Sequence, residues 1–173
     1  MRKSTQRAIK EAKQLRETAY HEAGHAVAAV VMGLGLRKKG VTTLTTDGNL
    51  GYTYVRQPRK TQDGDMRYVV VLLSGGVAVG ILKGEKPHET QDLYGAGTDL
   101  EYATAALCWI PDMEAKYKLR RLLYETAQEL LQDNWAAVEA VAGMLIECRS
   151  LSGNQVEAVV SQTRGQLQYK GGQ

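Results

Sequence analysis

The sequence predicts an α+β fold that is predominantly α-helical, with one small β-hairpin. Most of the longer segments repeat apolar side chains at helical spacing. Only residues 41–55 combine β-branched and tyrosine residues on the two sides of a turn signal. With 173 residues, the chain has the size of one domain whose core needs no disulfide bonds.

The first helix is expected over residues 4–32. Ala8, Ala12 and Leu15 recur at helical spacing, and a run of alanine and valine extends the pattern. Gly33 and Gly35 then end it. The helix begins with charged residues and becomes apolar in its second half, so it should pass from the surface into the core. We therefore treat residues 1–17 as an N-terminal helical extension of the domain.

The hairpin should pair residues 41–46 with residues 50–55. The intervening Asp-Gly-Asn at residues 47–49 is typical of a tight turn. Residues 57–65 are polar and indicate an exposed loop. Residues 68–82 are nearly uncharged but number only about 15, fewer than the ~20 that a membrane-spanning helix needs. We expect residues 66–82 to form a buried core helix, followed by a loop over residues 83–97.

Four further helices are expected towards the C-terminus. Thr98 and Glu101 match a capping box that opens a helix running through residue 108. Pro111 should start the next helix, which reaches about residue 131, and Asn134 should cap a third over residues 135–148. A second capping box at residues 152–155 opens a last short helix. The main domain then spans residues 18–163, and residues 164–173 form a polar tail.

Composition narrows the classes of function. The net charge of +3 without a dense basic block does not indicate nucleic-acid binding. The N-terminus lacks the apolar region of a secretory signal, and no anchor in a membrane is expected. Cys108 and Cys148 stand far apart, which excludes a zinc finger or a disulfide framework. Both cysteines are expected to be buried, and the protein is expected in the cytoplasm.

The most informative segment is residues 21–25, which read His-Glu-Ala-Gly-His. On a helix, His21 and His25 lie on one face, about 5–6 Å apart at Cβ. Two imidazoles at that spacing can bind one metal ion, and Glu22 lies beside them without having to bind it. The pattern is typical of metallopeptidases, in which the glutamate acts as the general base.

A catalytic zinc ion needs a third protein ligand and keeps one open position. The metzincin pattern requires glycine and histidine where this chain has Ala28 and Val31, so that class is excluded. The thermolysin-like class requires a glutamate about twenty residues after the second histidine. No glutamate occurs between Glu22 and Glu85, so that class is poorly supported.

Several residues could supply the third ligand. Asp99 lies in the first turn of a predicted helix, where the helix dipole favours a carboxylate in any case. His88 has suitable chemistry, but a single histidine in a loop is more often merely solvated. The residues that remain open at this point are Asp47, Asp63, Asp65, His88, Asp92 and Asp99.

Four segments in chain order resemble the peptidase domain of the FtsH/AAA-protease family, the M41 zinc metallopeptidases. They are Thr-Ala-Tyr-His-Glu-Ala-Gly-His at residues 18–25, Leu-Gly-Tyr-Thr at 50–53, Gly-Thr-Asp-Leu-Glu-Tyr-Ala-Thr at 97–104 and Leu-Ser-Gly-Asn-Gln-Val at 151–156. The resemblance implies a zincin-like helical domain. It also implies that His21, His25 and Asp99 bind Zn²⁺ and that Glu22 is the catalytic base.

The implied function is that of a zinc-dependent metalloendopeptidase. It would cleave unstructured proteins or peptides through attack of a zinc-bound water assisted by Glu22. The family usually carries an ATPase module and membrane helices ahead of the peptidase, whereas only about 17 residues precede the motif here. We therefore expect no ATPase activity of the chain's own. A separate AAA ATPase and a homo-oligomer remain open as partners.

The chain also departs from the family pattern. Where the family has Gly-Gly-Arg-Ala-Ala-Glu-Glu, residues 74–80 read Ser-Gly-Gly-Val-Ala-Val-Gly. Carboxylates near a metal often orient its histidine ligands, so their loss could weaken zinc binding or activity. Two alternatives follow: a catalytically weak or silent zinc-binding module with a regulatory or protein-binding role, and a fold relative whose histidines have no remaining function.

Overall fold

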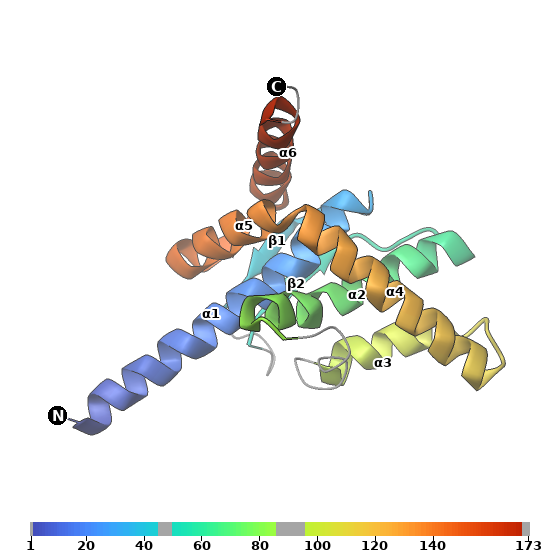
Figure 1. Ribbon diagram of the computed structural model, residues 1–173, viewed down its shortest axis with the longest axis horizontal. Coiled ribbons are helices and arrows are strands. Elements are labelled where there is room, and N and C mark those ends of the chain that lie inside the picture. The colour runs from blue at the N-terminus through green and yellow to red at the C-terminus, as the bar shows by residue number, and fades with distance from the viewer. Residues whose placement is uncertain (1, 45–49, 86–95, 171–173) are drawn as a thin grey trace.

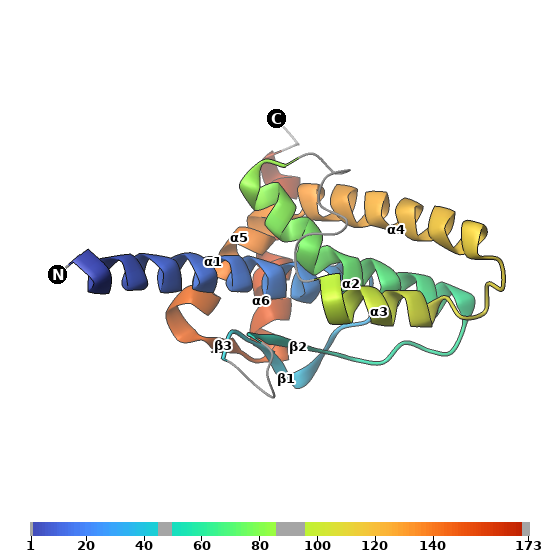
Figure 2. The same cartoon turned by 90° about the horizontal axis from the view of Figure 1, so that it is seen from below.

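The computed structural model describes residues 2–44, 50–85 and 96–170. Within these residues it contains six helices and one three-stranded antiparallel sheet. The predicted fold class, predominantly α-helical α+β, is therefore confirmed. Figure 2 shows the strands together on the side of the first helix that faces away from α4.

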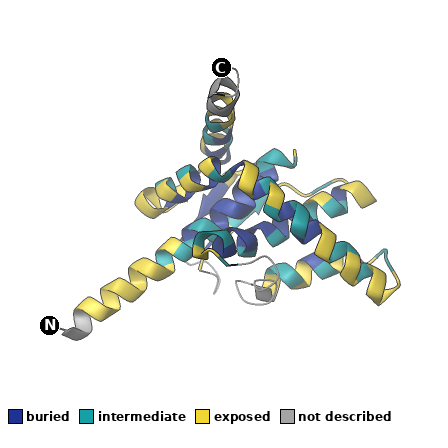
Figure 3. Ribbon diagram, in the orientation of Figure 1, coloured by how far each residue is buried: buried dark blue, intermediate teal, exposed yellow. Residues whose placement is uncertain are grey.

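The first helix, α1 (Arg2–Val31), crosses the centre of the molecule. Its N-terminal part projects from the body and is exposed, and it becomes buried from Ala19 onwards (Figures 1 and 3). α1 packs closely against α2 (Gln62–Lys83). At their crossing, a Cβ atom on Gly24 would collide with the Ser74 carbonyl and come within 2.7 Å of the Ala78 Cβ. The absence of a side chain at Gly24 thus sets how near the two helices lie.

The strands are β1 (Leu36–Thr42), β2 (Tyr52–Val55) and β3 (Ser150–Leu151), in the order β2-β1-β3. β1 begins five residues earlier than predicted, and its register with β2 shifts between Leu36 and Val41. Gly40 lies in this shift with φ of 66°, a backbone conformation that glycine adopts readily. The predicted turn at residues 47–49 lies outside the described residues. β2 is an edge strand of the sheet.

α2 confirms the predicted core helix, although it begins at Gln62 because the Thr61 hydroxyl accepts a hydrogen bond from the Gly64 N–H. The exposed loop is correspondingly shorter than expected. By length and composition alone, α2 is the one described helix that could cross a membrane. Of its most apolar window, 56% is buried inside the protein, as in a core helix.

The remaining helices are α3 (Ala96–Ala106), α4 (Met113–Asp133), α5 (Trp135–Cys148) and α6 (Gly153–Lys170). All four were predicted, but two of the capping predictions were wrong. α3 begins before Thr98, which therefore lies inside the helix. The Asn134 side chain donates to the Leu130 carbonyl in the last turn of α4 and makes no capping hydrogen bond at the start of α5.

The second capping box is confirmed, since the Gln155 side chain accepts from the Ser152 N–H at 2.9 Å. The helix that it opens reaches Lys170, well beyond the short helix that the sequence suggested. The prediction that both cysteines are buried was also wrong, because Cys108 and Cys148 are exposed. Cys108 lies two residues beyond the end of α3, and Cys148 is the last residue of α5. At such positions neighbouring helices do not enclose a small apolar residue.

Candidate metal centre

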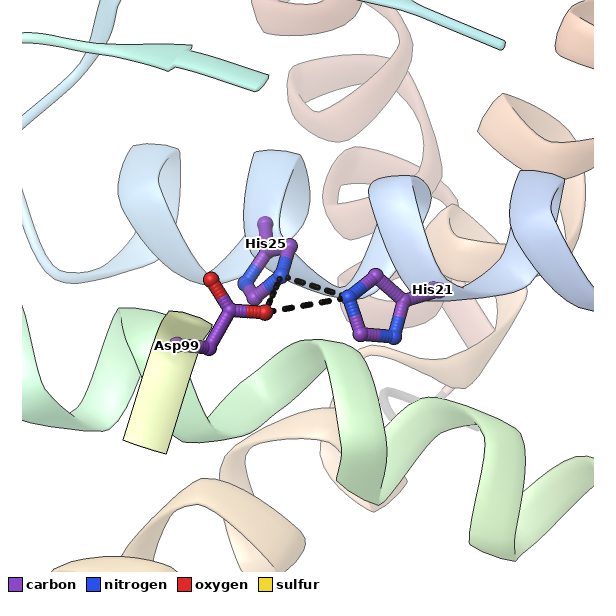
Figure 4. A group of neighbouring side chains, drawn as sticks. All are labelled: His21, His25 and Asp99. Carbon is purple, nitrogen blue, oxygen red and sulfur yellow. Dashed lines mark hydrogen bonds and ion pairs between the residues drawn. The ribbon is translucent and has the colours of Figure 1, made fainter. Parts of the chain in front are cut away.

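His21, His25 and Asp99 meet between α1 and the first turn of α3, as Figure 4 shows. The Nε2 atoms of the two histidines are 3.0 Å apart, and each lies 3.2 Å from Oδ2 of Asp99. The two imidazoles on successive turns of α1 have the relative position that the sequence predicts. Their approach to Asp99, 74 residues beyond His25, depends on the packing of α3.

A backbone carbonyl holds the His25 ring. Its Nδ1–H donates a 2.7 Å hydrogen bond to the carbonyl oxygen of Val71 in α2. Because Nδ1 carries that proton, Nε2 has its lone pair free in the neutral ring and faces His21 and Asp99. This contact orients a ligand-type histidine without a carboxylate. This partner could not be predicted from the residue types, since any residue can supply a carbonyl.

The donor set fits a zinc ion. Two imidazole nitrogens and one carboxylate oxygen form a common ligand set of catalytic zinc sites. With bonds of 2.0–2.1 Å, two ligand atoms of a tetrahedral site lie about 3.3 Å apart. The three observed separations of 3.0, 3.2 and 3.2 Å are close to that value. These three residues could therefore hold a zinc ion and leave a fourth position open.

Electrostatics couple the three groups. Burial lowers the pKa of His25, but the charge and hydrogen bond of Asp99 outweigh it and raise that pKa to about 9. Burial likewise raises the pKa of Asp99, and the two histidines more than reverse this, so that the carboxyl is held well below its usual pKa. Without a metal, the cluster thus retains a proton near neutral pH, which a metal ion must displace.

Gly75 in α2 provides the space for both rings. A Cβ atom there would collide with Nε2 of His25 and would lie 2.6 Å from its Cε1 and 2.7 Å from Nε2 of His21. The glycine-rich segment at residues 74–80 therefore lies, through Gly75, directly against the candidate metal centre.

Glu22 is buried, with 6% of its surface exposed, and points towards the sheet. The Thr53 hydroxyl on β2 donates a 2.7 Å hydrogen bond to Oε2 of Glu22 and lies 3.2 Å from its backbone carbonyl oxygen. A Cβ atom on Gly51 would lie 2.8 Å from both Cγ and Oε1 of Glu22. The Leu-Gly-Tyr-Thr segment of the hairpin thus encloses the carboxylate that the sequence predicts as a base.

The site opens into a cavity of about 560 Å³ between α1, α2, α3 and the β2 edge. Its lining includes all four predicted site residues and several tyrosines, of which Tyr68 is half-buried. Burial raises the pKa of Tyr68, against a hydrogen bond from Gln57 that lowers it. Tyr68 was not singled out from the sequence, because tyrosine is frequent throughout this chain.

Among the described residues, the other two candidate ligands, Asp63 and Asp65, do not join the cluster. Asp63 is exposed in the first turn of α2, where its carboxylate pairs with Arg67 at 2.9 Å. Asp65 lies in the same turn and belongs to no metal-type cluster among the described residues. Asp47, His88 and Asp92 lie outside the described residues.

The fold and the site together define a helical α+β domain with a His-Glu-x-x-His helix and a nearby carboxylate. No family model matches the chain. The chain is similar to the ATP-dependent zinc metalloprotease FtsH 1 of Symbiobacterium thermophilum, with 29% identity over 182 aligned residues. The alignment covers 87% of this chain but 30% of that relative, so the chain spans about a third of the relative's length.

Proposed function

We propose that this protein is a zinc-dependent metallopeptidase whose metal is held by His21, His25 and Asp99. The observation that carries the proposal is the triangle of donor atoms with sides of 3.0, 3.2 and 3.2 Å, next to a buried glutamate. Similarity to a zinc metalloprotease over most of the chain supports the same conclusion. The domain that carries this activity is proposed to span residues 18–163.

When bound, zinc lowers the pKa of a coordinated water and polarises a substrate carbonyl. Glu22 serves as the proton carrier. Its Oε2 accepts a hydrogen bond from the Thr53 hydroxyl, which holds the carboxylate in place. The carboxylate accepts the proton of the attacking water and delivers it to the leaving amide nitrogen. The Val71 carbonyl keeps His25 in the tautomer that presents Nε2 to the site.

The proposed substrate is an extended polypeptide segment. β2 lies at the edge of the sheet and lines the cavity, so a peptide can add to it through backbone hydrogen bonds. Such binding requires an unfolded segment, because the backbone of a folded protein is already paired. An ATPase that unfolds substrates is a proposed partner, and a cytoplasmic location stays a prediction.

The test is cleavage of unfolded casein by the purified, zinc-loaded protein. We expect cleavage that stops with a chelator and returns when zinc is added. Glu22→Gln should still bind zinc and lose turnover by about 10³-fold or more, because the amide cannot accept the proton. Full activity in Glu22→Gln would refute the mechanism. Tight zinc binding without any cleavage by the parent would instead favour the silent zinc-binding module.

A further inference from the structure

We propose that Thr53 is a positioning residue for Glu22, which ties the orientation of the base to strand β2. This inference rests on the proposed function. Its starting point is that the carboxylate Oε2 accepts a 2.7 Å hydrogen bond from the Thr53 hydroxyl, across 31 residues of sequence. The base and its partner therefore come from different elements, α1 and the sheet.

The alternation of side chains along β2 explains the contact. Tyr52 and Tyr54 lie on one face of the strand, where their rings are 4.6 Å apart. Thr53 consequently faces the opposite way, towards α1. Its backbone position is fixed by pairing with Val41 of the central strand. The sheet thus holds the hydroxyl that binds Glu22, and no neighbour of Glu22 within α1 supplies it.

The lack of free space around the Glu22 side chain restricts its conformation further. Gly51, two residues before Thr53 on the same face of the chain, leaves room for the Glu22 side chain but for no Cβ of its own. A buried carboxylate with few alternative partners depends strongly on the hydrogen bond that it has. Without the Thr53 hydroxyl, the carboxylate would lose the hydrogen bond on Oε2 and would be free to rotate about its side-chain bonds.

This arrangement connects substrate binding with the base. The edge strand to which an extended substrate would add is also the strand that holds the Glu22 carboxylate. Any shift of β2 against α1 is transmitted to the carboxylate through one hydrogen bond. Thr53 should therefore affect the turnover of a bound substrate more than the binding of substrate or zinc.

The test compares Thr53→Val, Thr53→Ser and a matched control, Thr42→Val. Valine keeps the shape of threonine and removes the hydroxyl, whereas serine keeps the hydroxyl. Thr42 lies on the neighbouring strand, and its hydroxyl bonds to Ser150 at 2.7 Å without touching Glu22. Thr53→Val removes the contacts of the Thr53 hydroxyl with Oε2 and the backbone carbonyl of Glu22. Thr42→Val removes contacts with Ser150, the Arg149 carbonyl and the Leu44 N–H. The melting temperature of the control should therefore fall at least as far as that of Thr53→Val.

Thr53→Val should lower kcat for casein by about tenfold or more, since small misplacements of reacting groups cost this much. KM and zinc affinity should stay within about threefold, Thr53→Ser should restore most of kcat, and Thr42→Val should keep it. Equal losses of kcat in Thr42→Val and Thr53→Val would overturn the proposal.

A second measurement does not depend on activity. NMR side-chain couplings in the metal-free protein should show one Glu22 rotamer in the parent and rotamer averaging in Thr53→Val. An unchanged single rotamer in that variant would overturn the positioning role. If the parent cleaves nothing, the proposed function fails, and the NMR comparison alone still decides whether Thr53 holds Glu22.

Discussion

Gly75→Ala should separate the stability of the fold from its capacity to bind zinc. The new Cβ would lie 2.6 Å from Cε1 of His25 and 2.7 Å from Nε2 of His21. Non-bonded carbon contacts are favourable at about 3.5 Å, so the His21 ring would have to retreat by about 0.8 Å and the His25 ring, whose Nε2 is nearest to the new Cβ, by more. Zinc sites tolerate deviations of only about 0.2 Å in ligand distance. The Val71 carbonyl also limits how far the His25 ring can move.

The effect on folding should be much smaller than the effect on zinc. Alanine favours the helix over glycine by about 1 kcal/mol, and this offsets part of the ~1–3 kcal/mol that overpacking costs. We expect a metal-free protein whose free energy of unfolding lies within about 2 kcal/mol of the parent. Zinc affinity should fall by about 10- to 100-fold, as for changes to groups that orient metal ligands.

Zinc affinity is measured by competition with a chromophoric chelator, and stability by urea denaturation. Gly143→Ala is the matched control, because it lies in α5 with nothing within 4 Å of the added Cβ. That control should gain about 0.5–1 kcal/mol and keep its zinc affinity. If Gly75→Ala binds zinc within threefold of the parent, the inferred packing of the two rings against α2 is incorrect.

Two further predictions concern the pH dependence of zinc binding and the capping of α4. The pKa of His25 is raised to about 9 in the metal-free protein, so its proton is present below that pH and competes with zinc. Apparent zinc affinity should therefore rise about tenfold per pH unit from pH 7 to pH 9 and then level off, whereas a flat profile in competition titrations would contradict the coupling. The Asp112 carboxylate accepts a 2.7 Å hydrogen bond from the Ala115 N–H at the start of α4, so Asp112→Ala should lower the free energy of unfolding by about 1 kcal/mol. Urea denaturation measures this loss, and a variant as stable as the parent would show that the cap contributes nothing.

Much of the secondary structure was predictable because it depends on local spacing. The helical repeat placed His21 and His25 on one face, and the apolar run predicted α2 as a core helix. Errors arose where a polar side chain had two possible partners. Asn134 could cap its own helix or bond to the Leu130 carbonyl, and it does the latter. The local sequence pattern allows either hydrogen bond and does not indicate which of the two forms.

The sequence by itself determined the part of the candidate site that α1 supplies: the imidazoles of His21 and His25 one turn apart on one face, and the Glu22 carboxylate beside them. Backbone geometry fixes such a face wherever the helix forms. The resemblance implied Asp99 as the third ligand, but its 3.2 Å approach to His25 is a property of the tertiary structure. Only the tertiary structure showed the Val71 carbonyl on the His25 ring, the space at Gly75 and the hydroxyl of Thr53 on Glu22. These contacts join elements far apart in the chain, and their distances depend on how helices and strands pack, which no local spacing encodes.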